Sequence, residues 1–485
     1  MTQHFYRFRP IKALLDDYHE LENQEIYFAS PSELNDPQEG VCDVFWLGDR
    51  VVWKNLHRHY LKCLTRAMQV WCATAGEHEL DWRIVPMVDP WLPENASPEL
   101  NEIVEQIEAE FFSPEIEAYI DALAARRTPV RRDELRFYIE SLNLLAVSKI
   151  VSCHERSGRP LIDPIEISTP KFIDVINVAV KLCVKVISQA ESAGTTVESR
   201  QAVSALFQTV GQNRSQNMLM YQSDGLIDLS VPGKKFVFVD FPRSYVDKLD
   251  SILYPPWYAA CFMSDCEHAA LWAHYGGNHT GACLIFKSAD DNGSPSISLI
   301  HATSVDMSGP REVRCSHPFI PVTYSNDGVD VDFFRSLGRL PNPLLKKTWF
   351  FDSKDGWSTC ARDMREDNDA WRARYWMGFE RGATTKTRDW QPEGERRLLL
   401  HSLIIDFSSV GMRKVKYDFA SLVGIIFGVK TSEDDKIRIM RIIDAKCDLS
   451  GRNDFKFYQA TYSSVTGRLA HSEMALLNSR ARGKA

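Results

Sequence analysis

Two glutamates separated by a single residue are the side chains whose spacing in this sequence most directly permits chemistry. Glu393 and Glu395 lead into the apolar stretch 398–400, which predicts a β-strand. Side chains two residues apart in a strand point to the same face of a sheet. The two carboxylates would therefore converge on one substrate, while Arg396 would face away. Carboxylates in such a place can orient a reacting group, accept its proton or stabilise positive charge.

A second set of polar side chains lies within the first forty residues. Residues 5–9 alternate aromatic and basic side chains, as in a half-buried strand, and residues 26–29 form a short apolar strand. The stretch 11–21 between them has apolar residues at helical spacing, and Ser30 before a proline is typical of a helix start. This strand–helix–strand unit would bring four polar residues to one end of two strands: Arg7, Ser30, Asp36 and Glu39.

A third segment places aromatic and histidine side chains on a short helix between two strands. Residues 257–263 and 281–286 predict buried strands, and residues 267–275 predict the helix. Ser264, followed three residues later by Glu267, predicts a capping box. The segment is rich in possible zinc ligands: Cys261, Cys266, His268, His274, His279 and Cys283. Their spacing matches no standard zinc motif, so no metal is favoured there.

The rest of the chain supplies further strands and a long helical block. Helical periodicity covers much of residues 97–212, and the Arg- and Trp-rich stretch 371–376 predicts an amphipathic helix. Further strands are predicted over residues 235–241, 297–300, 319–324, 413–419, 422–429 and 455–462, the last at an edge. We therefore expect an α+β protein with a split mixed β-sheet core and a large helical insertion. The expected division is a discontinuous α+β domain of residues 1–50 and 235–430, a mainly helical insertion of residues 51–234 and a C-terminal extension of residues 431–485.

Composition limits the class of protein. The chain has 485 residues, of which 44% are hydrophobic and 25% charged, as in globular proteins. Its net charge of −8 gives no overall positive field that would attract nucleic acid or membrane. No apolar run approaches the roughly 18 to 20 residues that cross a bilayer, and there is no signal-peptide pattern. Eleven cysteines without a Cys-x-x-Cys pair predict reduced thiols, a cytoplasmic location and no membrane partner.

Four motifs follow one another along the chain. They are Tyr6-Arg7; residues 27–31 with Asn35, Asp36, Pro37 and Glu39; residues 271–275 leading to 279–281; and Lys386 with Trp390, Glu393, Glu395 and Arg396. Together they resemble a bacterial family described only as domain of unknown function 2971 (DUF2971). The resemblance covers about residues 1–45, 255–290 and 385–430 and leaves the helical block outside. The family implies no activity, so the chemistry depends on the residues themselves.

The order of these residues also resembles, more distantly, the ADP-ribosyltransferase fold. That fold carries an Arg or His on its first strand, a Ser or Tyr on its second and a Glu, often within Glu-x-Glu, on a late strand. The corresponding residues here are Arg7, Ser30 and Glu395, with Glu393 as the first acid. Two features depart from the pattern: the helical block stretches the spacing, and Ser30 is followed by Pro31 instead of a Ser/Thr run.

The resemblance implies an ADP-ribosyltransferase or NAD glycohydrolase that consumes NAD as a substrate, in a toxin or anti-phage defence role. Glu395 would hold the ribose 2′-hydroxyl and stabilise the oxocarbenium-like charge, and Glu393 would orient or deprotonate the acceptor. Arg7 would bind the pyrophosphate or the adenosine ribose, and Tyr275 or Trp272 would stack on nicotinamide. The NAD-binding residues would be Tyr6, Arg7, Ser30, Asn35, Asp36, Trp272, His274 and Tyr275. The acceptor would be a protein, a nucleic acid or water, and the helical insertion could hold a partner protein.

Two other interpretations of the same residues stay open. A metal-dependent hydrolase or nuclease would hold Mg²⁺ through four carboxylates: Asp36, Glu39, Glu393 and Glu395. Lys386 would then steady a phosphate. Alternatively, the pocket could bind a ligand without any chemistry. Individual residues could also be purely structural, as an Arg7–Glu395 ion pair between strands or a helix cap at Ser30.

Overall fold

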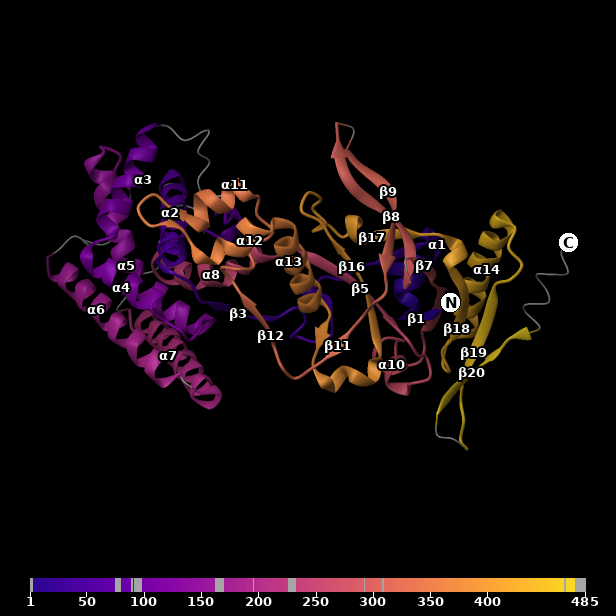
Figure 1. The fold of residues 1–485 in the computed structure, drawn as a ribbon. Coiled ribbons are helices and arrows are strands. Elements are labelled where there is room, and N and C mark those ends of the chain that lie inside the picture. The colour runs from indigo at the N-terminus through magenta and orange to yellow at the C-terminus, as the bar shows by residue number, and fades with distance from the viewer. Residues whose placement is uncertain are drawn as a thin grey trace. The chain divides into compact units, whose positions relative to one another are not determined.

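The computed structural model describes residues 3–475, apart from residues 75–79, 89, 91–97, 162–169, 195, 226–232, 292, 308, 466 and 467. The chain forms two compact units, whose elements are labelled in Figure 1. Unit 1 contains residues 1–41, 255–329 and 380–485, and unit 2 contains residues 42–254 and 330–379. Helices together with mixed sheets confirm the α+β class.

Unit 1 is built on a large sheet in which the first strand of the chain lies among later ones. Within the described residues the strand order is β10, β16, β5, β1, β6, β18, β19, β20. Their bounds are β1 (His4–Arg9), β5 (Trp257–Met263), β6 (Ala282–Lys287), β10 (Ile320–Pro321), β16 (Glu395–His401), β18 (Leu422–Phe427), β19 (Lys456–Tyr462) and β20 (Leu469–Glu473). Neighbouring strands are antiparallel, except that β18 and β19 are parallel.

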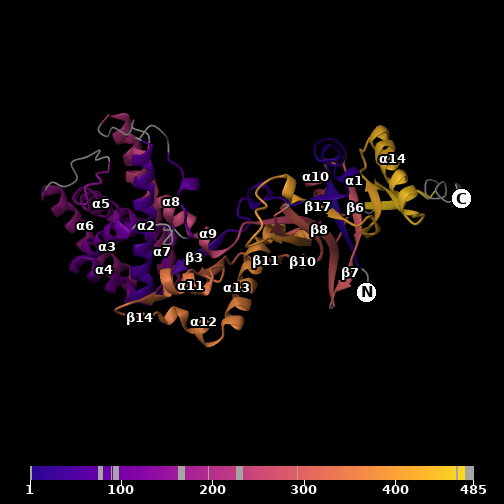
Figure 2. The same ribbon diagram turned by 90° about the horizontal axis from the view of Figure 1, so that it is seen from above.

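A second sheet of unit 1 packs its apolar side chains into the same core as the first. Its strand order is β2 (Glu25–Tyr27), β17 (Lys414–Tyr417), β8 (Ser294–Asp306) and β7 (Ala289–Asp291). A fifth strand, β9 (Gly309–Pro318), pairs with β8. The shared core includes Phe5 and Leu299 from the two sheets and Ile439 from helix α14 (Glu433–Ser450). The hydroxyl of Ser432 caps this helix, which Figure 2 shows from above.

Short elements carry or flank several of the predicted site residues. Helix α10 (Ala269–His274) lies between β5 and β6, the 3-10 helix η2 (Pro31–Glu33) follows β2, and β15 (Thr385–Lys386) and the 3-10 helix η7 (Arg388–Glu393) precede β16. β15 pairs in parallel with β11 (Thr323–Tyr324). Between η7 and β16, Gly394 has a φ of +55°, a left-handed conformation that glycine adopts without strain. This turn sets the direction in which the chain enters β16.

Unit 2 is mainly helical. Its helices are α2 (Arg50–Ala73), α3 (Pro98–Phe111), α4 (Pro114–Ala124), α5 (Arg132–Arg156), α6 (Pro170–Ala193), α7 (Val197–Ser223), α8 (Phe241–Lys248), α9 (Asp250–Leu253), α11 (Asn342–Leu345), α12 (Arg362–Glu366) and most of α13 (Asn368–Ala383). β3 (Cys42–Trp46) pairs with β4 (Val130–Arg131) and lies beside β12 (Val329–Asp332). α5 contacts α3, α6, α7 and α8. The helical block predicted over residues 97–212 is therefore confirmed for its described part.

Two predictions of local structure are wrong. Residues 235–241 form a π-helix, η4 (Phe236–Asp240), that leads into α8, instead of a strand. An apolar run of that length does not distinguish a strand from a buried helical turn. Ser264 and Glu267 form no capping box, because α10 begins only at Ala269 and the Ser264 hydroxyl donates to the Gly394 carbonyl at 2.9 Å.

The division of the chain also differs from the expected one. The described part of residues 431–485, predicted as an extension, contributes α14, β19 and β20 to unit 1. β20, not β19, is at the edge of the sheet. Residues 330–379, predicted within the α+β domain, belong to unit 2.

None of the described helices is both long and apolar enough to cross a membrane.

Candidate functional site

Strand β5 joins the early and late parts of the candidate site. Met263 of β5 pairs with Tyr6 of β1 on one side and with Glu395 of β16 on the other. Arg7 follows Tyr6, and β16 begins at Glu395. The sheet therefore places residues from the two ends of the chain on strands that flank β5, as the predicted site requires.

Three carboxylates surround the ammonium group of Lys386. Its Nζ lies 2.9 Å from Glu393 Oε2, 3.1 Å from Glu395 Oε2 and 3.3 Å from Glu39 Oε1. It also lies 4.6 Å from the centroid of the Trp390 ring. The lysine and all three glutamates are buried. Glu393 and Glu395 thus do converge, but on a side chain of the protein itself.

Arg397 is a second cation in this group and is absent from the predicted site. Its Nε lies 2.8 Å from Glu395 Oε1, its Nη2 lies 2.7 Å from Glu39 Oε2, and its Nη1 donates to the Ala383 carbonyl at 2.7 Å. The side chain is fully buried. A signal for it exists in the sequence, because a residue two positions after Glu395 in a strand shares its face. The charge cluster, as we call it, consists of Glu39, Lys386, Glu393, Glu395 and Arg397.

The cations fix the ionisation of the cluster. Burial by itself raises the pKa of Glu395, but the ion pairs with Arg397 and Lys386 outweigh it and lower the pKa to about 2. For Glu39 burial is the larger effect, and its pKa is raised despite the same two cations. Burial opposes the charge of Lys386, yet the surrounding carboxylates raise its pKa. At neutral pH Glu395 is therefore an anion and Lys386 is a cation, so Lys386 does not act as a base.

A cavity of about 180 Å³, which we call the inner cavity, opens beside the charge cluster. Its walls include Arg7, Asn35, Glu39, Cys261, Tyr275 and Lys386. Cationic and acidic groups therefore share one small space, and the strands β1 and β5 supply part of its wall.

Arg7 is a residue of this wall whose partners are incomplete. Its Nη2 donates to the Tyr27 carbonyl at 2.9 Å, and its Nη1 reaches the Cys261 carbonyl at 3.5 Å. Its buried Nε has no hydrogen-bond partner, and no carboxylate of the described chain forms an ion pair with it. Burial lowers the pKa of Arg7 to about 10, which still leaves the guanidinium charged at neutral pH. Because a buried charge without a counter-ion is costly, this wall is suited to an anionic ligand.

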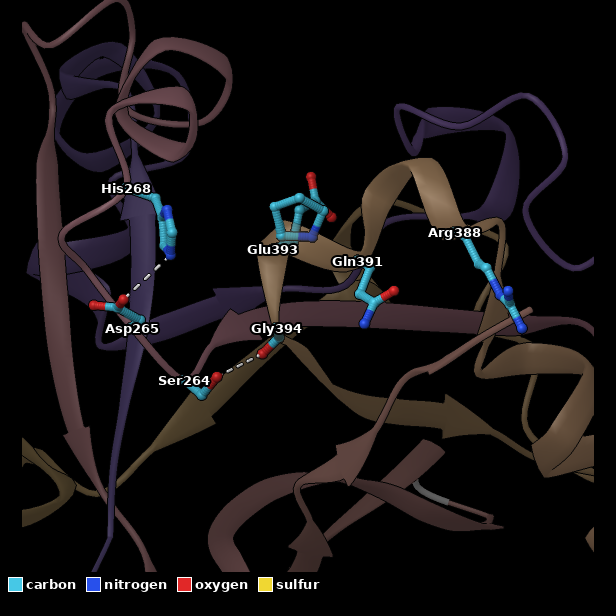
Figure 3. Close-up of a pocket in the computed structure, with 8 residues that line it drawn as sticks. Ser264, Asp265, His268, Arg388, Gln391, Glu393 and Gly394 are labelled. Atoms are coloured by element: carbon cyan, nitrogen blue, oxygen red, sulfur yellow. Dashed lines mark hydrogen bonds and ion pairs between the residues drawn. The ribbon is translucent and has the colours of Figure 1, made fainter. Parts of the chain in front are cut away.

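A larger and more open space, the outer cavity, measures about 560 Å³ (Figure 3). Its lining consists of Ser264, Asp265, His268, Arg388, Gln391, Pro392, Glu393 and Gly394. Glu393 connects this space to the inner cavity, because its Oε1 accepts a 2.6 Å hydrogen bond from the hydroxyl of Tyr275, whose side chain belongs to the inner wall. The Tyr275–Glu393 pair therefore links the linings of the two cavities.

Two of the N-terminal candidates have local structural roles. Ser30 and Glu33 form a capping box at η2, in which the Ser30 backbone N–H donates to Glu33 Oε2 at 2.7 Å. Asp36 accepts from the Gln38 backbone at 2.9 Å within its turn. Neither residue is among those lining the two cavities. The helix cap predicted at Ser30 is therefore confirmed.

The aromatic candidates separate into core and cavity residues. Trp272 is buried, packs edge-on against Phe8 and donates its Nε1–H to the Cys266 carbonyl at 2.8 Å. Tyr6 packs against the same apolar cluster, and His274 lines neither cavity. A stacking role for Trp272 on a ligand is thus wrong, because no face of its ring is exposed. Tyr275 is the candidate from this set that lines a cavity.

The four carboxylates of the predicted Mg²⁺ site do not form one group. Lys386 Nζ occupies the position between Glu39, Glu393 and Glu395 that a cation would take, and Asp36 is bonded elsewhere. Within the described ranges no three or more His, Cys, Asp or Glu side chains are grouped so as to hold a metal ion. That statement includes the cysteine- and histidine-rich segment 261–283.

Comparison of the chain with protein-family models, curated proteins and solved structures finds no match. The chemistry of the site therefore has to be inferred from its own geometry.

Proposed function

We propose that unit 1 binds NAD and cleaves its nicotinamide–ribose bond, as an ADP-ribosyltransferase or an NAD glycohydrolase. The observation that carries this proposal is Arg7, a buried guanidinium with an unpartnered Nε and no carboxylate partner in the described chain. A phosphate group would supply the missing counter-charge through charge-assisted hydrogen bonds. Acidic groups that could stabilise a positive transition state, Glu39 and the Tyr275-bound Glu393, lie at or beside the same cavity.

The proposed reaction assigns different roles to the two glutamates of the doublet. When the bond breaks, nicotinamide leaves with the bonding electrons, and ribose C1′ becomes oxocarbenium-like. Glu393 lines the outer cavity, so it would stabilise this charge and then take the proton of the attacking hydroxyl or water. Glu395 is only 2% exposed and is bound by both Arg397 and Lys386. We therefore assign Glu395 a positioning role, instead of the contact with ribose that the resemblance implies.

The sizes of the cavities limit how the substrate would bind. Small-molecule sites typically measure about 300–1,000 Å³, so an inner cavity of about 180 Å³ does not enclose a whole dinucleotide. The outer cavity of about 560 Å³ has a suitable size. We propose that NAD extends from Arg7 into the outer cavity after Tyr275 rotates away from Glu393.

A ligand-binding module without catalysis is the second candidate. Glu39 and Glu395 each contact both Lys386 and Arg397. Because these carboxylates already have partners within the protein, binding without catalysis is favoured. In that case the inner cavity would bind a phosphate-bearing ligand without turnover. The hydrolase interpretation has less support, because Lys386 takes the cation position.

Biological context is proposed from the resemblance alone. The motifs similar to DUF2971 fall almost entirely within the segments of unit 1, which supports placing the activity in that unit. A toxin or defence role would make expression of the wild-type chain slow bacterial growth, with an acceptor in a protein or nucleic acid.

The decisive experiment is incubation of the full-length protein with labelled NAD, with and without cell lysate. We expect nicotinamide release by the wild type and a loss of about 100-fold or more in Glu393→Gln, in the range of general acid–base contributions. Glu22→Gln, an exposed glutamate of unit 1, is the matched control and should keep full activity.

The other outcomes separate the candidates. Thermal stabilisation by NAD without nicotinamide release would support the binding module. Release that survives Glu393→Gln but stops on chelation would contradict the proposed roles. If NAD neither stabilises the protein nor is consumed, the proposed NAD-cleaving activity is wrong.

A further inference from the structure

Strand β9 forms an open edge of the second sheet of unit 1. Within the described residues it pairs with β8 alone, over residues 309–318. β8 in turn pairs with β17 at Leu299 and Ile300 and with β7 at residues 294–296. Beyond Ile300 the described chain therefore forms a two-stranded ribbon, whose far end stands clear of the other elements of unit 1 in Figure 1. No residue of β9 lines the inner or the outer cavity, so this edge is independent of the site proposed above.

The free part of this ribbon exposes apolar side chains as well as its backbone edge. Val305 of β8 is 59% exposed and Val313 of β9 is 40% exposed. The outer edge of β9 has no partner strand in the described chain. A two-stranded ribbon alone is only marginally stable in water, and a long exposed edge is a template for another strand. The ribbon is therefore suited to gain a third strand along β9.

The residues along this edge are complementary to a second copy of themselves. Glu312, Val313 and Arg314 follow one another on β9 and are all exposed. In an antiparallel pair with a two-fold axis at Val313, Glu312 of each copy lies opposite Arg314 of the other. Opposite charges across a strand pair are stabilising, and like charges are destabilising. An axis at Arg311, Glu312 or Arg314 would place like charges opposite each other. Arg314 also contacts Asp418 of its own chain, but its side chain is 54% exposed, so a second carboxylate can reach it.

We propose that two copies of this chain pair antiparallel along β9, with Val313 at the two-fold axis. The ladder covers residues 311–315, because Pro310 has no backbone N–H to extend it. Arg311 of one copy then lies opposite Cys315 of the other. The two ribbons join into one four-stranded sheet, which covers the free edge of β9 in both chains. A strand of another protein would need the same order of charges, which a second copy has by identity.

The first test is the mass of the full-length protein, measured by sedimentation over a range of micromolar concentrations. We expect a reversible monomer–dimer equilibrium for the wild type. Glu312→Arg places like charges opposite each other at both symmetric positions and should weaken dimerisation at least 10-fold. Glu380→Arg reverses an exposed charge elsewhere in unit 1 and should dimerise as the wild type does. A monomeric wild type, or equal dimerisation of the two variants, would overturn the proposal.

Cysteine substitution tests the register of the two strands. Opposite residues of an antiparallel pair have Cα atoms about 4.5–5.5 Å apart, within the range that a disulfide spans. With a mild oxidant, Val313→Cys should therefore form a disulfide-linked dimer, and Arg311→Cys should link to the native Cys315 of the second copy. Val305→Cys, at a more exposed position on β8, should link at least 10-fold more slowly. Linking of Val305→Cys as fast as that of Val313→Cys would contradict the pairing along β9.

A third measurement uses the wild type alone and does not depend on the folding of any variant. Amide hydrogen exchange of residues 311–315 should slow as the protein concentration rises, because pairing covers the outer edge of β9. Exchange in β20, an edge strand of the other sheet, should not depend on concentration. Exchange of residues 311–315 that stays constant while the dimer forms would show that the copies meet through another surface.

Discussion

Two buried arginines flank β5 in unit 1, and their surroundings differ. Arg397 contacts Glu39, Glu395 and the Ala383 carbonyl, so its Nε, Nη1 and Nη2 all have acceptors. Arg7 has two carbonyls, no carboxylate of the described chain and a bare Nε. Both are removed from solvent. The charge cluster therefore contains its own counter-ions, whereas the wall around Arg7 has none for its guanidinium among the described residues.

The largest effect should follow from removing the saturated arginine. Arg397→Met leaves Glu39 and Glu395 buried with Lys386 as their remaining cation, and breaking a buried pair in this way costs about 3–5 kcal/mol. We expect faster hydrogen exchange of β5 and β16 by a corresponding factor, measured by mass spectrometry on the full chain. Arg441→Met, at an exposed position of unit 1, is the control. Unchanged exchange in Arg397→Met would show that the cluster does not stabilise the sheet.

A smaller and pH-dependent effect is expected from Glu395→Gln. The pKa of Glu395 in the folded chain is about 2, below the ordinary 4.5, so its ionised form stabilises the fold above pH 4.5. This contribution is lost as the pH falls from 4.5 towards 2. The difference in unfolding free energy between wild type and Glu395→Gln should therefore shrink over that interval in acid denaturation experiments. A difference independent of pH would argue against the ion pairs. The contribution of Glu39 to the unfolding free energy changes with pH in the opposite direction. Its pKa is raised in the folded chain, so its protonated form stabilises the fold at low pH, and this contribution is lost as the pH rises.

The smallest effect on stability is expected at the unsaturated arginine. Arg7→Met replaces a buried charge without a counter-ion by an apolar side chain of similar length, so the unfolding free energy should change by less than about 1 kcal/mol or increase. Ligand binding should respond instead: ADP-ribose should raise the melting temperature of the wild type and of Arg441→Met, but not that of Arg7→Met. A destabilisation of Arg7→Met as large as that of Arg397→Met would remove the contrast between the two arginines.

Strands with a clear period of two were predictable from the sequence, and short elements were not. β1, β5, β6 and β16 lie where alternating or apolar runs indicated. The run at residues 235–241 became a π-helix, because its apolar composition suits any buried backbone. The hydroxyl of Ser264 bonds to Gly394, a residue of another segment, and no local pattern could have indicated this partner.

The sequence predicted which residues form the site better than it predicted how they are arranged. Glu393 and Glu395 converge on Lys386 as expected, but Glu393 lies in η7, before the turn at Gly394, so strand alternation does not cause the convergence. Arg397 could have been found by applying the period of two once more. The burial of Glu395 depends on Lys386, Cys261 and other residues from separate segments packing around it, which the sequence does not specify.

The strand order of unit 1 has a consequence for synthesis. β1 is synthesised well before its neighbour β5 and the next strand, β16, which come from far later in the chain. At about 5–20 residues per second, the first strand waits roughly 20 to 80 s before the last of these partners is made. Any activity that needs Arg7 beside the glutamates is therefore withheld from nascent chains until β16 has been synthesised.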